Sequence, residues 1–205
     1  VSIGMVSITA TTGSPVELLS RADSACYAAK DKGRNRVQVY RPEDAELQQR
    51  HDEMQWVARI RRAIEEDRFV LYCHKILPLT PNPDGDCYCE TLLRMIDESG
   101  DIVPPMAFLP AAERYDLMPI IDRWVIRNSL ATFGKHRREI AGPTPNCFIN
   151  LAAASLSDEN MFDFIREQIE LTGMRPEEVC FEITETGAVA NLDIAVAFME
   201  KLKKL

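Results

Sequence analysis

The chain has 205 residues, of which 46% are hydrophobic and 27% charged, an ordinary composition for a globular protein in water. Its net charge of −8 and pI near 5.0 argue against a general binder of nucleic-acid polymers or anionic membranes, since phosphate backbones favour positive surfaces. No run approaches the roughly 18 apolar residues that cross a bilayer, and Val1 opens no export signal. Secreted and membrane-spanning classes are therefore excluded, and we expect a cytoplasmic protein.

The cysteines support the same compartment. Apart from one close pair they are scattered through apolar segments and form no C-x-x-C motif. This pattern favours reduced thiols over a disulfide framework or a zinc site. The six positions are Cys26, Cys73, Cys87, Cys89, Cys147 and Cys180.

The first forty residues predict a strand, a helix and a second strand. A β-branched run at 1–9 is the first strand, and the second spans 36–40. Ser14 followed by Pro15 predicts the start of a helix over 15–32. The polar segment that follows contains a proline, so we predict a domain boundary there, with domains at 1–40 and 41–205.

The second domain alternates strands and helices. Two early strands predict a hairpin, and the order helix, strand, helix, strand, helix that follows predicts a parallel sheet with crossover helices. An eight-unit barrel needs about 250 residues and about 160 follow the boundary, so the predicted class is α/β with an incomplete barrel. The predicted strands are 69–77, 86–95, 146–151 and 178–184; the predicted helices are 43–67, 105–115, one over 117–125, 160–172 and 188–205.

Polar side chains interrupt these apolar strands near their carboxyl ends. Strand alternation puts Glu90 and Arg94 on one face, and Asn150 and Glu182 are the polar residues of the later strands. An unpaired buried carboxylate is costly, so we expect pairing, protonation or metal binding. Oxygen donors of this kind suit Mg²⁺, Mn²⁺ or Ca²⁺ better than zinc. The alternative is a structural Glu90–Arg94 ion pair, with the other two residues capping helices.

The segments ETLLRM, PPMAFLPAAERYDLM, FINLAAASL and CFEITET resemble an EAL domain, the cyclic di-GMP phosphodiesterase family, over about residues 50–205. The preceding SIGMVSIT and LLSRADSACYAAKDKGRNRVQVY resemble the carboxyl end of a GGDEF, or diguanylate cyclase, domain. The resemblance implies an incomplete TIM-like (β/α)8 barrel preceded by a short α+β remnant at 1–40. It also implies a divalent-metal site at the carboxyl rim of the barrel.

The resemblance assigns roles residue by residue. Glu90, Asn150 and Glu182 match the metal ligands, for Mg²⁺ or Mn²⁺, and Glu90 is also counted as catalytic. Arg94 matches a residue that contacts a ligand phosphate, and Leu92 one that lines the pocket.

Other positions match less closely. Glu185 would position a catalytic loop, while His74 and Lys75 stand where the family usually has Gln-Pro. His74 could hydrogen-bond a guanine edge, or be structural. Lys30 and Arg34 match phosphate-contacting positions of the cyclase family, or form a solvated helix end.

The implied reaction is metal-dependent hydrolysis of cyclic di-GMP to linear pGpG by a full-length homodimer, which parts outside this sequence could tether to a membrane. We expect this chain alone to be inactive, because the resemblance puts further catalytic residues after Leu205. One alternative is a catalytically silent cyclic di-GMP receptor. Another is a regulatory relay through the helix at 43–67.

Overall fold

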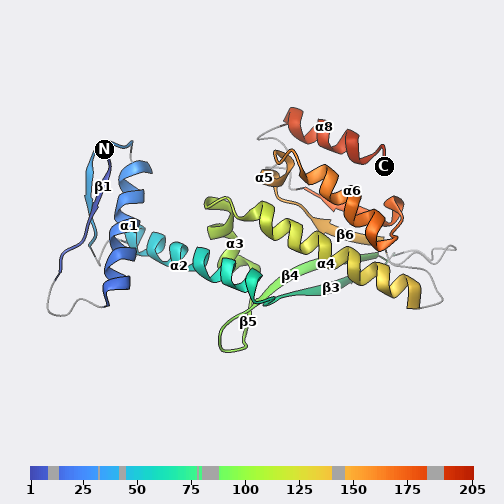
Figure 1. Ribbon diagram of the computed structural model, residues 1–205, viewed down its shortest axis with the longest axis horizontal. Helices are drawn as coiled ribbons and strands as arrows, with labels where there is room; N and C mark the ends of the chain where they lie inside the picture. The colour runs from blue at the N-terminus through green and yellow to red at the C-terminus, as the bar shows by residue number, and fades with distance from the viewer. Residues whose placement is uncertain are drawn as a thin grey trace. The chain divides into compact units, whose positions relative to one another are not determined.

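The computed structural model describes residues 1–8, 14–31, 33–41, 45–77, 79, 88–139, 146–183 and 192–205 (Figure 1). The chain divides into two compact units, 1–62 and 63–205. This division falls inside the long helix α2 (Ala45–Glu65) and therefore after the domain boundary predicted at residue 41. The predicted boundary stays a prediction.

The first unit is a strand–helix–strand arrangement, as its sequence predicts. β1 (Ile3–Met5) pairs in parallel with β2 (Val37–Val39), and α1 (Pro15–Asp31) connects them. The Ser14 hydroxyl accepts a 3.3 Å hydrogen bond from the backbone N–H of Glu17, which confirms the predicted start of this helix.

Small residues let β1 lie directly on α1. A Cβ at Gly4 would lie 2.0 Å from the backbone oxygen of Ala22, so only glycine fits this strand position. Beneath the strands, Ala25, Ala28 and Tyr40 form a small buried core.

A mixed sheet organises the second unit. Its strands are β3 (Phe69–Ile76), β4 (Tyr88–Ile96), β5 (Ile102–Val103), β6 (Asn146–Asn150) and β7 (Val179–Glu182). They lie in the order β3-β4-β6-β7, with β5 paired to β4. β3 and β4 are antiparallel, which confirms the predicted hairpin pairing. β4, β6 and β7 are parallel, which confirms the predicted α/β sheet.

Helices connect and cover the parallel strands. They are α3 (Pro105–Arg114), α4 (Met118–Glu139), α5 (Ala153–Leu156), α6 (Met161–Thr172), the 3₁₀ turn η1 (Pro176–Glu178) and α8 (Leu192–Leu202). α4 packs against β3, β6 and α6, and is the long helix drawn in yellow in Figure 1. The largest fully buried side chains of this unit include Met95, Phe108, Ile121, Ile126, Leu130, Ile149, Met161 and Ile165.

Three of these elements were not predicted: β5, α5 and η1. They contain two, four and three residues, which are too few for a hydrophobic pattern to repeat. Most of the longer elements were predicted to within a few residues, because each repeats its apolar spacing several times. The exception is α4, which continues to Glu139 although its predicted stretch ended at residue 125.

The cysteine prediction is wrong at one pair. The structure joins Cys73 on β3 and Cys89 on β4 in a disulfide, with the two Cα atoms 5.8 Å apart. Spacing along the sequence does not reveal this proximity, because antiparallel pairing of the two strands brings the residues together. Cys26, Cys147 and Cys180 are free thiols, and Cys87 lies outside the described residues.

In the parts of the chain that the structure describes, every helix is too short or too polar to cross a bilayer. The observed sheet is part of an α/β fold, and its continuation into a larger barrel stays a prediction.

Candidate functional site

Three predicted metal ligands lie on neighbouring parallel strands. Asn150 is the last residue of β6 and Glu182 the last of β7, and the two are directly paired across the strands. Glu90 on β4 is paired with Phe148, two residues before Asn150. Side chains two residues apart on a strand share a face, so the three side chains project from the same face of the sheet.

Burial differs from what the strand pattern predicts. Glu90 is half-buried, with 25% of its side chain exposed, but Asn150 and Glu182 are exposed. The prediction of buried polar groups at these two positions is wrong, because each residue ends its strand. These two side chains are therefore accessible to solvent and to a ligand.

Both carboxylate oxygens of Glu90 have partners. Asn150 Nδ2 donates a 3.0 Å hydrogen bond to Oε1 of Glu90, and His74 Nδ1 lies 3.7 Å from Oε2. His74 is the direct cross-strand partner of Glu90 on β3, and its side chain is 68% exposed. Strand pairing thus gathers these three residues, which the sequence singled out separately, around one carboxylate.

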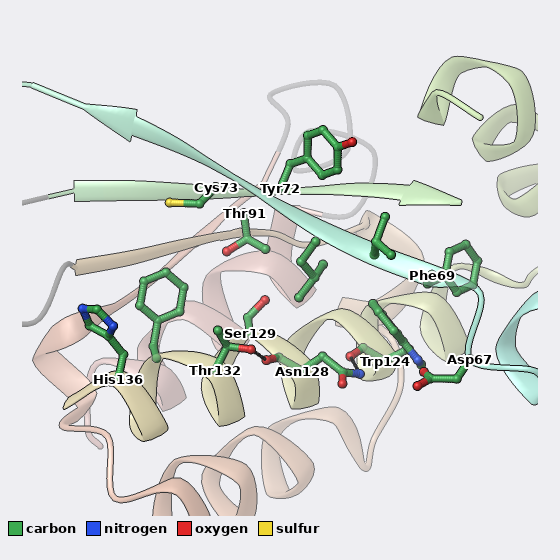
Figure 2. A pocket seen from close by; sticks show the side chains of 13 residues that line it. Asp67, Phe69, Tyr72, Cys73, Thr91, Trp124, Asn128, Ser129, Thr132 and His136 are labelled. Atoms are coloured by element: carbon green, nitrogen blue, oxygen red, sulfur yellow. Dashed lines mark hydrogen bonds between the residues drawn. The ribbon is translucent and has the colours of Figure 1, made fainter. Parts of the chain in front are cut away.

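Arg94 and Glu90 both lie in the described part of the chain, and they do not form the ion pair that was the structural alternative to a metal site. Arg94 Nη1 donates a 2.7 Å hydrogen bond to the backbone oxygen of Leu93. Its guanidinium lies 5.3 Å from the ring centre of Tyr72, an aromatic residue of β3 that the sequence analysis missed. Figure 2 shows this ring on the side of β3 away from α4. The structural reading of Glu90 and Arg94 as each other's partner is therefore wrong.

A cavity of about 730 Å³ adjoins these strand ends, within the size range of small-ligand sites. Leu92, Asn150 and Glu182 line it, together with residues of α3, α4 and the segment after β6. Leu92 is the cross-strand partner of Tyr72, the residue whose ring the Arg94 guanidinium contacts, but neither Tyr72 nor Arg94 lines this cavity. Two of the three predicted metal ligands and the predicted pocket residue Leu92 therefore line one cavity, while Glu90 reaches it only through its hydrogen bond to Asn150.

The donor set fits a hard divalent cation. Glu90, Asn150 and Glu182 offer two carboxylates and an amide oxygen, the ligands that Mg²⁺ and Mn²⁺ prefer. Among the described residues no group of three or more His, Cys, Asp or Glu side chains gathers to hold a metal. Beside the two carboxylates, the amide oxygen of Asn150 is the third oxygen donor that these strand ends offer.

The model of the EAL domain matches residues 57–205. The chain belongs to the EAL domain family. It is 37% identical over 190 residues to the cyclic di-GMP phosphodiesterase PdeB of Shewanella oneidensis, covering 92% of this chain and 22% of that protein. It is 28% identical over 154 residues to the cyclic di-GMP phosphodiesterase PdeF of Escherichia coli, covering 75% of this chain and 20% of that protein.

The EAL fold is also found among solved structures. The Xanthomonas citri FimX EAL domain in complex with c-diGMP superposes with a TM-score of 0.67 at 28% identity, covering 76% of this chain and 59% of that domain. The present EAL chain therefore spans about a fifth of its two curated relatives and about three fifths of that structural neighbour.

Asp122 is a further polar residue beside these strand ends that the sequence analysis missed. It lies on α4, is 4% exposed and lines the 730 Å³ cavity. Its Oδ2 accepts hydrogen bonds from the backbone N–H of Ala152 at 2.9 Å and from the Ser155 hydroxyl at 2.5 Å. Burial raises the pKa of Asp122 to about 6, against the lowering effect of these two hydrogen bonds. The available signal was an aspartate on the buried stripe of its helix, four residues before Ile126.

A second cavity, of about 550 Å³, lies between β3 and α4 (Figure 2). Its wall includes Thr91, which is on the opposite face of β4 from Glu90, and aromatic residues such as Phe69 and Trp124. None of the predicted site residues lines it. The cavity at the strand ends, which Leu92, Asn150 and Glu182 line, is therefore the candidate ligand site.

Glu185 lies outside the described residues, so its predicted role is untested. Lys30 and Arg34 lie in the first compact unit, Lys30 in the last turn of α1 and Arg34 in the following turn with a positive φ of 60°.

Proposed function

We propose that this EAL chain is part of a divalent-metal-dependent phosphodiesterase that hydrolyses cyclic di-GMP to linear pGpG. The observation that carries the proposal is the meeting of Glu90, Asn150 and Glu182 beside a cavity of ligand size. The family and its phosphodiesterase members support the choice of substrate.

Glu90, Asn150 and Glu182 would hold the metal, Mg²⁺ or Mn²⁺. A bound divalent ion supplies positive charge that acidifies water and stabilises a phosphate under attack. The protein contributes the geometry: Glu90 and Asn150 already lie in hydrogen-bond contact, and Glu182 is the strand partner of Asn150. Small adjustments of these side chains would turn three oxygens toward one point.

Arg94 would bind a phosphate of the ligand. A planar guanidinium donates to two phosphate oxygens at once, and among the residues that the structure describes no carboxylate pairs with Arg94 to compete with the phosphate. The Tyr72 ring would hold it at the cavity edge, while Leu92 packs on the ligand and His74 contacts a guanine edge. These roles place positive charge where the substrate is negative, despite the net charge of −8.

The finer assignments belong to the same proposal. Glu185 would position a catalytic loop, and residues 1–40 would be the remnant of a GGDEF domain. We further propose that the domain at 41–205 continues into a TIM-like barrel, in a homodimeric, cytoplasmic protein. The parallel β1–α1–β2 unit supports the GGDEF reading as far as its secondary structure goes.

A catalytically silent receptor for cyclic di-GMP is the second candidate. The observation in its favour is that both oxygens of Glu90 have protein partners, Asn150 and His74. A receptor would bind the ligand with this arrangement intact and without metal.

The test is turnover of cyclic di-GMP by the full-length gene product with Mg²⁺ or Mn²⁺. We expect linear pGpG, and a loss of kcat/KM of at least about 100-fold in Glu90→Ala. Glu170→Ala is the matched control, since it removes an exposed carboxylate on α6 and should leave turnover unchanged. Tight binding in EDTA without turnover would establish the receptor instead.

A further inference from the structure

We propose that Asp122 is a positioning residue of this site: by fixing the segment that follows β6, it keeps the side chain of Asn150 where a divalent cation is bound. The proposal rests on the proposed function, since it assigns Asn150 to the metal site.

Both side-chain hydrogen bonds that the described residues make with Asp122 come from the segment after Asn150. One carboxylate oxygen, Oδ2, accepts both from the backbone N–H of Ala152 and from the hydroxyl of Ser155. Ala152 lies two residues after Asn150, and Ser155 lies in α5, the short helix that begins at the next residue, Ala153. The carboxylate therefore holds the turn that leads out of β6.

This turn is held from two sides. The backbone N–H of Leu151 donates a 2.8 Å hydrogen bond to the backbone oxygen of Glu182, which ties the turn to β7. Asp122 ties it to α4, which packs against β6. Asn150 is the last residue of β6 and directly precedes this turn, so the attachments to β7 and to α4 both fix its backbone.

Burial makes the attachment to α4 specific. Asp122 is 4% exposed and Ser155 is fully buried, so water cannot easily replace the carboxylate as acceptor. Truncating Asp122 would leave the Ser155 hydroxyl and the Ala152 N–H without their acceptor. The turn would relax to find new partners, and the Asn150 amide would move relative to Glu90.

An aspartate is not required for its charge. Both hydrogen bonds end on the same oxygen, so the carbonyl oxygen of an asparagine in the same rotamer can accept both. An alanine can accept neither. The pair Asp122→Asn and Asp122→Ala therefore separates the hydrogen-bonding role from charge.

The experiment measures Mn²⁺ binding to the full-length protein by the electron paramagnetic resonance signal of free Mn²⁺, without substrate. We expect Asp122→Ala to weaken binding at least about 10-fold and Asp122→Asn to stay within about 3-fold of wild type. Asp163→Ala, which removes an exposed aspartate of α6, is the matched control and should not change binding. Unchanged Mn²⁺ affinity in Asp122→Ala, or equal loss in both variants, would overturn the proposal.

Ser155→Ala carries the test if Asp122→Ala does not fold. It removes one of the two donors, and a several-fold weaker Mn²⁺ affinity is expected; an unchanged affinity counts against the proposal. Glu90→Ala separates this proposal from the proposed function. If wild type binds no Mn²⁺, both fail together. If wild type binds Mn²⁺, Glu90→Ala does not and Asp122→Ala binds normally, the positioning role alone is wrong.

Discussion

The amide of Asn150 donates a 3.0 Å hydrogen bond to Oε1 of Glu90, joining side chains that lie 60 residues apart in the sequence. The two residues come from adjacent parallel strands, and their contact depends on the register in which Glu90 pairs with Phe148. An amide and a carboxylate in contact present two oxygens to one point once the amide turns. The hydrogen bond thus shows that the two side chains lie close enough for their oxygens to bind the same cation.

Asn150→Asp should make the protein more dependent on metal. The change puts a second carboxylate beside that of Glu90, and two like charges in contact disfavour the metal-free fold. We expect a Tm about 2–4 °C lower without metal, and a larger rise with Mn²⁺ than wild type shows. Thermal unfolding with and without Mn²⁺ measures both. Asn150→Ala adds no charge and should gain less from Mn²⁺ than wild type; equal responses of the two variants would contradict the prediction.

Tyr72 should support ligand binding through Arg94. Its ring lies 5.3 Å from the guanidinium, and such contacts contribute roughly 0.5–1 kcal/mol at exposed sites, which corresponds to about two- to five-fold in affinity. We expect Tyr72→Leu to weaken cyclic di-GMP binding by that factor, measured by isothermal titration. Tyr72→Phe keeps the ring and should bind as wild type does. Equal weakening in the two variants would show that the hydroxyl, and not the ring, matters.

The longer elements of the fold were predictable because local patterns repeat within them. The first turns of α4 and the alternating faces of β4 each repeat an apolar spacing, so their existence could be predicted, although the continuation of α4 to Glu139 was not. β5, α5 and η1 are too short to show a period. The Cys73–Cys89 contact depends on how two strands pair across a connection, which spacing alone does not determine.

The residues of the candidate site could be predicted from the sequence, but the contacts between them could not. Strand alternation and family resemblance singled out Glu90, Asn150 and Glu182. That Glu90 contacts Asn150 and His74, and not Arg94, follows only from strand register. Asp122 was missed because a single polar residue in an amphipathic helix has no distinct signal until its partners are known.

Glu178 should stabilise the fold at neutral pH. Burial by itself raises the pKa of this carboxyl, but hydrogen bonds from Arg175 and the charge of Arg137, whose Nη1 lies 3.3 Å away, outweigh burial and hold the pKa below its usual 4.5. An acid with a lowered pKa stabilises above its usual pKa, and this contribution is lost as pH falls through the lowered value.

We therefore expect Glu178→Gln to reduce the free energy of unfolding by about 2 kcal/mol at pH 7. The difference from wild type should shrink as the pH falls below the usual carboxyl pKa of 4.5. Urea unfolding at several pH values measures it. Glu177→Gln, on the exposed neighbour, is the control and should change little. A difference that stays constant with pH would mean that charge has no part in the role of Glu178.

Gly134→Ala should destabilise the protein although alanine favours helices. Gly134 is buried in α4 where that helix meets the end of α6, and an added Cβ would lie 2.6 Å from the backbone oxygen of Thr172. Backbone atoms cannot turn aside as a long side chain can, so the two helices must separate. Overpacking of this kind costs about 1–3 kcal/mol, while the gain in helix propensity is at most about 1 kcal/mol.

The control is the reverse change at an exposed position of the same helix, Ala131→Gly, where propensity acts alone. It should cost about 1 kcal/mol, by the loss of helix propensity. Chemical denaturation of both variants compares packing with propensity on one helix. A Gly134→Ala variant more stable than wild type would contradict the close contact between α4 and the end of α6.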